Sequence, residues 1–344
     1  MAGKHTFVRV LTGEGILSYL DDLLQDLVKV FLLQGATSLG RSLFLRLVGL
    51  GLCDRGYQDV EFFHSPFDHI SLEGLVLREK GIGVFDGEVF SLENLEGFPG
   101  IEIVEEVFLP AVSLPGEPLD EALIEDVVEV LHEATAMWKD FCFHQGKLID
   151  QHFLAGKVSA WAGEFLRKPR RLRRYFAVSL SPEGDVGFIS NLSRGCCRRY
   201  LIRGVPGSGC FLLHQVLLEA LSRHYQVEAY YSYLNPEDPV VVILPEERIA
   251  FIDTTSGVGV EVLPSDVIWE TSGAFKSTSD PDGERIKPKE PEKVRGLLSE
   301  AAQKMLQLQQ SGFQGFSLEN DFLGKEVNNF ISRILQDADA NDLL

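Results

Sequence analysis

Short apolar runs alternate with glycine-rich turns and helical patterns along the chain. The run VKVFLLQ (28–34) ends at a glycine, and LFLRLVGLGLCDRG (43–56) follows with the apolar spacing and glycine stop of a helix. DVEFFH (59–64) and GIGVF (81–85) are further runs rich in aromatic and β-branched residues, as in strands buried on both faces. This order predicts βαβ units and an α/β fold with mostly parallel sheets flanked by helices.

The two halves of the chain resemble each other. Residues 5–42 lie over residues 174–211 without a gap, so that Gly35 meets Gly204 and Gly40 meets Gly209. After a slip of two residues the match resumes, with GIGVFDG over RIAFIDT. Such self-similarity indicates a tandem duplication. We therefore expect two domains, at 1–170 and 171–344, that pack on each other.

Each half is expected to carry a helical appendage at its C-terminal side. Between 118 and 166 the apolar positions fall on one helix face, and the counterpart in the second half is 291–337. The segment 271–293 is rich in Ser, Gly, Pro and charge, which predicts a mobile loop. The basic run LRKPRRLRR (166–174) is interpreted as the join between the domains, with phosphate-reaching arginines as an alternative.

Composition limits the partners. The 344 residues carry a net charge of -19, and this field repels nucleic acid and anionic membrane surfaces. No run of 18 apolar residues and no secretory signal pattern is found, so we expect a cytoplasmic protein with no membrane partner. Five scattered cysteines, an odd number, form neither a disulfide framework nor a paired metal set, which favours reduced thiols.

The segment GATSLGRS (35–42) lies between a predicted strand and a predicted helix, the setting of the phosphate-binding pattern GxxxxGK[ST]. In such loops backbone N–H groups converge on phosphate oxygens at the helix N-terminus. Arg41 replaces the usual lysine and keeps its charge, although guanidinium is bulkier than ammonium; Ser42 keeps the hydroxyl that holds Mg²⁺. The alternative is a turn kept only for packing. The residues predicted to bind ATP or another phosphate-bearing small molecule here are Gly35, Ser38, Gly40, Arg41, Ser42 and Leu43.

Asp86 ends an apolar run about where a magnesium-positioning carboxylate is expected, and Asp253 ends the equivalent run of the second half. We predict Arg41 and Asp86 as catalytic residues, and Ser42 and Asp86 as metal ligands. Glu88 is a weaker candidate for polarising water. A carboxylate at a strand end is also a common cap or turn residue, so the structural alternative remains open for both aspartates.

The second loop, GVPGSGCF (204–211), lacks both the lysine and the hydroxyl. Its backbone still predicts an anion site at Gly204, Gly207, Gly209 and Cys210, but metal-dependent hydrolysis has lost both its partners. A structural or regulatory loop is the alternative. Cys210 is either a thiol activated by a helix N-terminus or a small residue that fills the space of the lysine.

In HSPFDH (64–69), His64 and Asp68 follow a predicted strand at the edge of the sheet where ligands bind. They either contact a substrate or a metal, or are hydrogen-bonded only locally.

With the duplication, both loops and the segment HSPFDHISLEG (64–74) in view, the chain resembles a bacterial family of tandem P-loop proteins described as ATPases or nucleotide-kinase-like proteins. Asp86-Gly87 and Phe98-Pro99-Gly100 also match the family pattern, whereas Arg41, Cys210 and Phe211 depart from it. The resemblance implies two P-loop NTPase-like domains that bind ATP with Mg²⁺. Because both loops are degenerate, we expect nucleotide binding at the first loop with weak or no hydrolysis. The alternatives are an inactive pseudo-NTPase that acts as a scaffold and, more remotely, a small-molecule kinase.

Overall fold

The computed structural model describes most of the chain. The described residues are 3–90, 95, 98–110, 120–148, 150, 156, 158, 171–204, 206–257, 259–271, 273, 290–312 and 320–341. The expected mobile loop lies largely outside this part, and so do residues 166–170 of the basic run.

The chain forms two compact units, neither of which is continuous in sequence. Unit 1 contains residues 1–8, 23–120 and 307–344, and unit 2 contains residues 9–22 and 121–306. Three segments are therefore assigned to units other than those expected from a division at residue 170. They are the antiparallel hairpin of β2 (Arg9–Thr12) and β3 (Gly15–Ser18), the helix α4 (Glu121–Leu148), which was expected in the first domain, and the last residues of the chain.

The sheet of unit 1 has six strands in the order β1-β5-β6-β7-β4-β8. Their bounds are β1 Lys4–Thr6, β4 Lys29–Gly35, β5 Val60–His64, β6 Leu72–Leu77, β7 Ile82–Asp86 and β8 Ile103–Leu109. β4 is parallel to both of its neighbours, β7 and β8, while β6 is antiparallel to β5 and to β7.

The sheet of unit 2 has seven strands in the order β10-β9-β12-β13-β14-β11-β15. Their bounds are β9 Arg171–Ser181, β10 Gly184–Gly187, β11 Arg198–Arg203, β12 Gln226–Ser232, β13 Asn235–Leu244, β14 Ile249–Asp253 and β15 Val267–Glu270. β11 is parallel to β14 and β15, and β13 is antiparallel to β12 and β14.

The strand order of one unit repeats in the other, as the sequence duplication predicts: β5-β6-β7-β4-β8 corresponds to β12-β13-β14-β11-β15. The α/β class is confirmed. Five strands of each sheet run in one direction, so the sheets are mostly parallel, as predicted. An antiparallel strand lies inside each sheet, however, because β6 and β13 follow β5 and β12 directly and turn back. In β6 every residue is buried, and Gly74 leaves room for Phe85 of β7 where a Cβ atom would collide with its ring.

Helices flank both sheets. In unit 1 they are α2 (Ser38–Asp54) and α9 (Asn320–Asn341), with a short 3-10 turn at Arg78–Lys80. In unit 2 they are α4 (Glu121–Leu148), α6 (Ile189–Leu192), α7 (Ser208–Ser222) and most of α8 (Glu290–Gly312), while α1 (Leu20–Leu24) crosses the division between the units.

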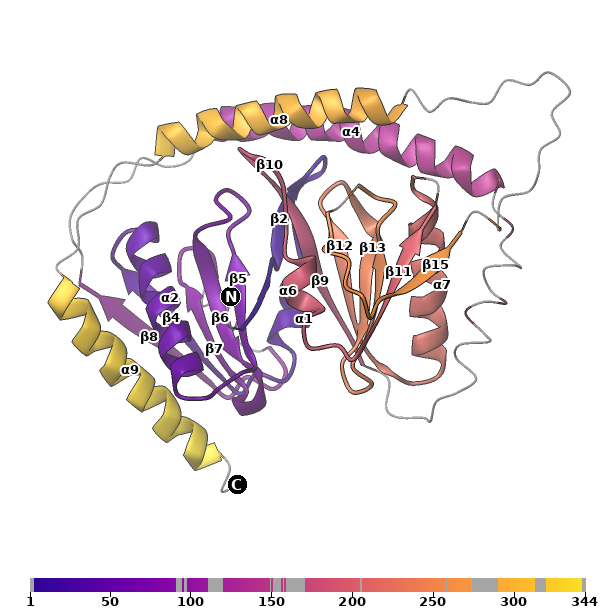
Figure 1. Cartoon of the computed structure of the whole chain (residues 1–344). Helices are drawn as coiled ribbons and strands as arrows, with labels where there is room; N and C mark the ends of the chain where they lie inside the picture. The colour runs from indigo at the N-terminus through magenta and orange to yellow at the C-terminus, as the bar shows by residue number, and fades with distance from the viewer. Residues whose placement is uncertain are drawn as a thin grey trace, which may run out of the picture. The chain divides into compact units, whose positions relative to one another are not determined.

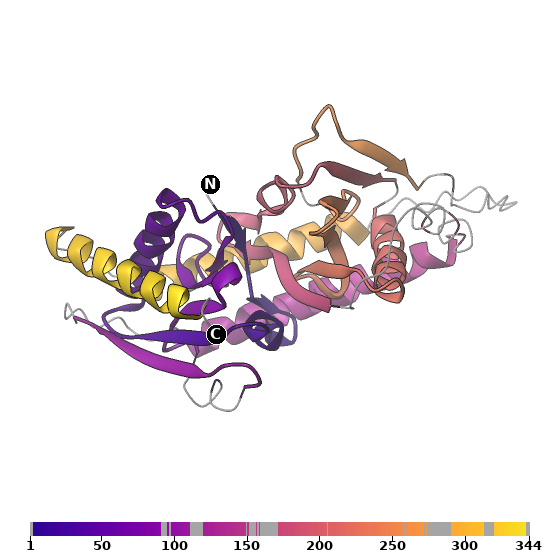
Figure 2. The ribbon, with the colours of Figure 1, turned by 90° about the horizontal axis from the view of Figure 1, so that it is seen from below.

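The two predicted appendages form different structures. α4 and α8 run side by side in two perpendicular views (Figures 1 and 2), and Lys304 of α8 donates to Asp126 of α4 at 3.2 Å. Trp138, Phe141 and Val294 form a small apolar cluster between these helices. α9, in contrast, packs against α2 in unit 1. The second appendage is thus divided between the two units.

The core of unit 1 depends on the last helix of the chain. Phe330 of α9 is buried, with its ring centroid 5.1 Å from that of Phe31 in β4 and 5.4 Å from that of Phe44 in α2. Val327, Ile331 and Ile334 join the same apolar cluster. α9 therefore closes the core beside the strand and the helix that carry the first glycine-rich loop.

We expect the substitution Phe330→Ala to destabilise unit 1 by about 3 kcal/mol, because a buried aromatic ring is lost and a cavity remains. Hydrogen–deuterium exchange of α2 peptides in increasing urea measures this. The exposed neighbour Asn329 provides the control: Asn329→Ala is expected to change stability by less than about 0.5 kcal/mol. Equal protection in Phe330→Ala and the unsubstituted protein would contradict the assignment of α9 to this core.

Candidate functional site

The first loop connects β4 to α2 as the sequence predicts. Gly35 has φ of 72°, and a Cβ atom there would collide with the carbonyl oxygen of Leu109 in the adjacent strand β8. Ala36 also has a positive φ, of 35°, which is uncommon for a residue with a side chain. Thr37 caps the helix, with its hydroxyl accepting from Gly40 N at 3.2 Å.

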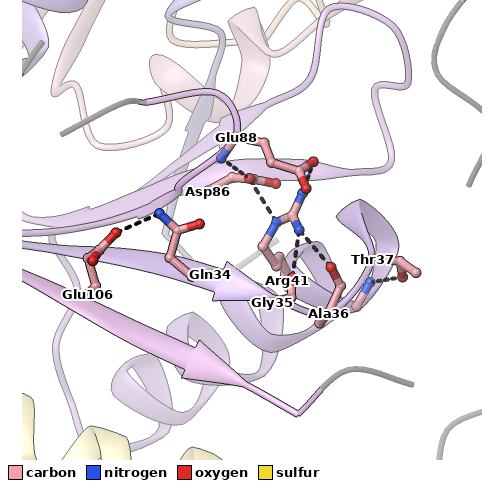
Figure 3. A network of polar contacts seen from close by, with 9 residues as sticks. Gln34, Gly35, Ala36, Thr37, Arg41, Asp86, Glu88 and Glu106 are labelled. Atoms are coloured by element: carbon pink, nitrogen blue, oxygen red, sulfur yellow. Dashed lines mark hydrogen bonds and ion pairs between the residues drawn. The ribbon is translucent and has the colours of Figure 1, made fainter. Parts of the chain in front are cut away.

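Arg41 lies in the first turn of α2, and its side chain is almost completely buried. Side chains on a helix point towards its N-terminus, so the guanidinium folds back under the loop (Figure 3). Nη1 donates to the carbonyl oxygens of Gly35 at 2.8 Å and Ala36 at 2.7 Å. The residue that replaces the phosphate-binding lysine is thus bonded to the loop itself.

Two carboxylates complete the surroundings of Arg41 (Figure 3). Nε donates to Asp86 Oδ1 at 2.8 Å, and Nη2 donates to Glu88 Oε2. Asp86 stands at the end of β7 beside Leu33 of β4, and it also accepts from Glu88 N at 2.9 Å. Burial raises the pKa of the Asp86 carboxyl, and the neighbouring Arg41 guanidinium partly offsets this effect.

The backbone N–H groups at the start of α2 remain open. No described residue accepts a hydrogen bond from the N–H groups of residues 37, 38 or 39, while Gly40 N and Arg41 N are bonded to Thr37. Ser38 is exposed and Leu39 is partly exposed, so these donors lie near solvent. The first N–H groups of a helix, aided by the helix dipole, bind anions. Leu43, in the next turn, is partly exposed and Gly40 is buried.

The side chains predicted to hold Mg²⁺ have other partners. Ser42 Oγ accepts from Leu72 N of β6 at 2.8 Å, and Asp86 is bonded to a guanidinium that brings its own positive charge. Mg²⁺ requires several oxygen ligands in near-octahedral geometry. Among the residues placed by the structure, no group of three or more His, Cys, Asp or Glu side chains is arranged to hold a metal ion. This arrangement does not fit Mg²⁺.

The second loop is closed from within. Gly207 N donates to Thr255 O at 3.3 Å, and Gly209 N donates to Thr255 Oγ1 at 2.9 Å. Gly204 has φ of 155°, and Gly207, with φ of 77°, caps α7. Thr255 occupies two of the donors that the sequence assigned to an anion. The sequence carries one signal for it: Thr255 follows Asp253 by two residues, as Glu88 follows Asp86.

Cys210 is a buried thiol that donates to Gly207 O at 2.9 Å. Its pKa is raised, chiefly by a contact with the thiol of Cys142 in α4 and also by burial. This supports the interpretation of Cys210 as a small space-filling residue and not as an activated thiolate. A cavity of about 20 Å³ beside it is lined by Trp138, Cys142 and Asp253, among others. α4 therefore covers the second loop.

Among the described residues, no cation pairs with Asp253 as Arg41 pairs with its counterpart Asp86. Oδ1 accepts from Thr255 N and Thr255 Oγ1, both at 2.7 Å, whereas Oδ2 has no hydrogen-bond partner in this part of the chain. Burial raises the pKa of this carboxyl to about 6, although hydrogen bonds from Thr255 and Ser256 act in the opposite direction. A Cβ atom at Gly209 would collide with the carboxylate, so only glycine fits there.

His64 and Asp68 are held by local hydrogen bonds. His64 Nδ1 lies 2.5 Å from the carbonyl oxygen of His69, so Nδ1 must carry a proton, and Nε2 then accepts from His5 Nδ1 at 2.8 Å. Asp68 accepts from Ile70 N at 3.0 Å and from Ser71 Oγ at 2.7 Å. β5, which ends at His64, is separated from β4 by two strands, β6 and β7.

Comparison with family models, curated protein sequences and solved structures found no match to this chain. The resemblance to tandem P-loop proteins stays a prediction. Within the described residues, no helix is both long and apolar enough to cross a membrane.

We expect His64 to stay neutral well below the ordinary pKa of histidine, because burial and the adjacent His5 lower its pKa to about 3. Its unfolded-state pKa is about 6.5. The unfolded chain therefore takes up this proton first, and the contribution of His64 to stability is lost progressively as the pH falls from 6.5 towards 3. NMR of ring-labelled histidine in the folded protein, with the urea-unfolded protein as control, measures both titrations. A folded-state midpoint near 6.5 would contradict the buried neutral pair.

For Asp253 the pH dependence of stability has the opposite sign. Its folded-state pKa of about 6 exceeds its unfolded value, so stability falls as the pH rises from about 4 to 6 and stays lower above that. We expect Asp253→Asn to be up to about 3 kcal/mol more stable than the unsubstituted protein at pH 7.5 and similar to it at pH 4. Tryptophan fluorescence in urea reports on unit 2, because Trp138 and Trp269 lie there. The exposed Glu237 gives the control Glu237→Gln, which should show no such difference.

Proposed function

We propose that the first loop binds the phosphate group of a nucleotide such as ATP, or of another phosphate-bearing small molecule, with weak or no hydrolysis. The observation that carries this proposal is the set of open backbone donors at residues 37–39, at the N-terminus of a helix of 17 residues. Backbone donors of this kind bind phosphate without any particular side chain.

The positive charge of Arg41 supports binding, and its bonding pattern argues against catalysis. A guanidinium held by Asp86, Glu88 and two carbonyl oxygens cannot follow the charge that develops on a transferring phosphoryl group without losing these bonds. The metal ligands that phosphoryl transfer ordinarily uses are also engaged elsewhere. Binding without metal-dependent turnover is the function that fits this arrangement.

The second loop serves packing in this proposal. Thr255 takes two of its backbone donors, and Trp138 and Cys142 of α4 line the cavity beside Cys210. A ligand entering there would have to break these contacts first. We therefore assign one phosphate site to each chain.

Calorimetry with ATP, ADP and inorganic phosphate, with and without Mg²⁺, tests the proposal. We expect one site with a dissociation constant of about 0.1 to 1 mM, equivalent to roughly 4 to 5.5 kcal/mol, and little effect of Mg²⁺. Ser38→Asp should abolish binding, because a carboxylate at the start of α2 satisfies the helix dipole and repels phosphate.

The matched control is Ser190→Asp, which adds the same charge at an exposed serine in unit 2. It should leave binding unchanged. Absence of heat for every ligand at millimolar concentration would overturn the proposal in favour of a pseudo-NTPase scaffold. Tight binding that requires Mg²⁺ would contradict the metal-free site.

A further inference from the structure

The two carboxylates that hold Arg41 differ sharply in exposure. The side chain of Asp86 is 2% exposed, whereas that of Glu88 is 69% exposed. A buried carboxylate cannot leave a buried guanidinium without a large desolvation cost, because it would leave an unpaired charge. An exposed carboxylate can rotate into water, where its interaction with the guanidinium is replaced by hydration. Glu88 is therefore the exchangeable partner of Arg41.

The hydrogen-bonding capacity of Arg41 is not fully used. A guanidinium has five N–H donors, and Arg41 makes four hydrogen bonds with described residues: one from Nε, two from Nη1 and one from Nη2. The fifth donor, on Nη2, has no acceptor among these residues. The nitrogen bonded to Glu88 thus carries one occupied and one free N–H, which is the arrangement an incoming oxyanion can use.

The position equivalent to Glu88 in the second half of the chain also contacts a glycine-rich loop. Thr255 is the counterpart of Glu88, since each follows the strand-end aspartate by two residues, and each donates its backbone N–H to that aspartate. Thr255 reaches the loop through its hydroxyl and bonds Gly209 N directly. In both halves, therefore, the residue at this position contacts the loop region: a neutral hydroxyl in unit 2 and a charged carboxylate in unit 1.

We propose that Glu88 is an internal competitor for the ligand, with its carboxylate bound to Arg41 where an oxygen of the ligand's phosphate binds once Glu88 has turned away. This inference rests on the proposed function of the first loop. It makes the ligand a dianionic phosphate group, such as the terminal phosphate of a nucleotide or a phosphomonoester. Such a group outcompetes a carboxylate for a guanidinium because it has more charge and more acceptor oxygens.

The competition also sets the affinity of the loop. In the unliganded protein the network of Arg41, Asp86 and Glu88 contains one positive and two negative side chains, so its surplus charge is negative beside the open donors. Removing the Glu88 charge should both weaken the bond to Nη2 and remove this repulsion. Screening by solvent reduces the effect of a charge that is 69% exposed, so we expect the change in affinity to be about tenfold.

The experiment compares Glu88→Gln with Glu106→Gln by calorimetry, using inorganic phosphate and metal-free ATP in the presence of EDTA. Glu106 lies on β8 and accepts from Gln34 Nε2 at 2.9 Å, close to the same loop but bonded to Gln34 and not to Arg41 (Figure 3). We expect Glu88→Gln to bind both ligands about tenfold more tightly than the unsubstituted protein, and Glu106→Gln to bind within about twofold of it. Circular dichroism checks that both variants fold.

The outcomes separate the two proposals. Binding by the unsubstituted protein that Ser38→Asp abolishes, but that Glu88→Gln and Glu106→Gln alter equally, would overturn the role of Glu88 and leave the phosphate site standing. Absence of binding in every variant, Glu88→Gln included, would overturn the phosphate site and with it the competitor. Tighter binding in Glu88→Gln that is lost again in the double variant Ser38→Asp/Glu88→Gln would support both.

Discussion

The buried guanidinium of Arg41 is the group on which the first loop depends. A charged side chain that is 1% exposed has to be paired and hydrogen-bonded, because an unpaired charge in the interior costs several kcal/mol. Asp86 supplies the charge and the carbonyl oxygens of Gly35 and Ala36 supply acceptors. These bonds hold the loop to the end of β7. The left-handed backbone at Gly35 and Ala36 is maintained by the same contacts, since it turns both carbonyl oxygens towards the guanidinium.

The second loop also connects a strand to a helix, but the side chains around it differ. Cys210 brings no charge, so Asp253 has one carboxylate oxygen without a partner among the described residues, and its pKa is raised. Thr255 accepts from the backbone donors of the loop, and side chains from α4 line the cavity beside Cys210. The two halves therefore share the order of five strands and the strand-end aspartate, while the interactions around each loop differ. One loop retains open donors at its helix, and in the other the donors of Gly207 and Gly209 are used internally.

Local patterns predicted the elements around the loop well. β4, β5, β7 and α2 lie where apolar runs and a glycine stop place them, because these signals depend on neighbouring residues. β6 was not predicted: it begins within the segment HSPFDHISLEG (64–74), and its glycine and glutamate weaken the strand pattern. It forms a strand because two neighbouring strands, β5 and β7, pair with it and bury it.

By itself, the sequence determined the α/β class, the similarity of the two halves and the position of both glycine-rich loops, since these depend on periodicity, spacing and glycine placement within short segments. Only the tertiary structure decided what the candidate residues do. Arg41 and Asp86 are 45 positions apart and meet because β4 and β7 are neighbours in the sheet. The partner that each polar group takes depends on which strands become adjacent and which groups are buried, and that is a property of the packed chain rather than of any segment.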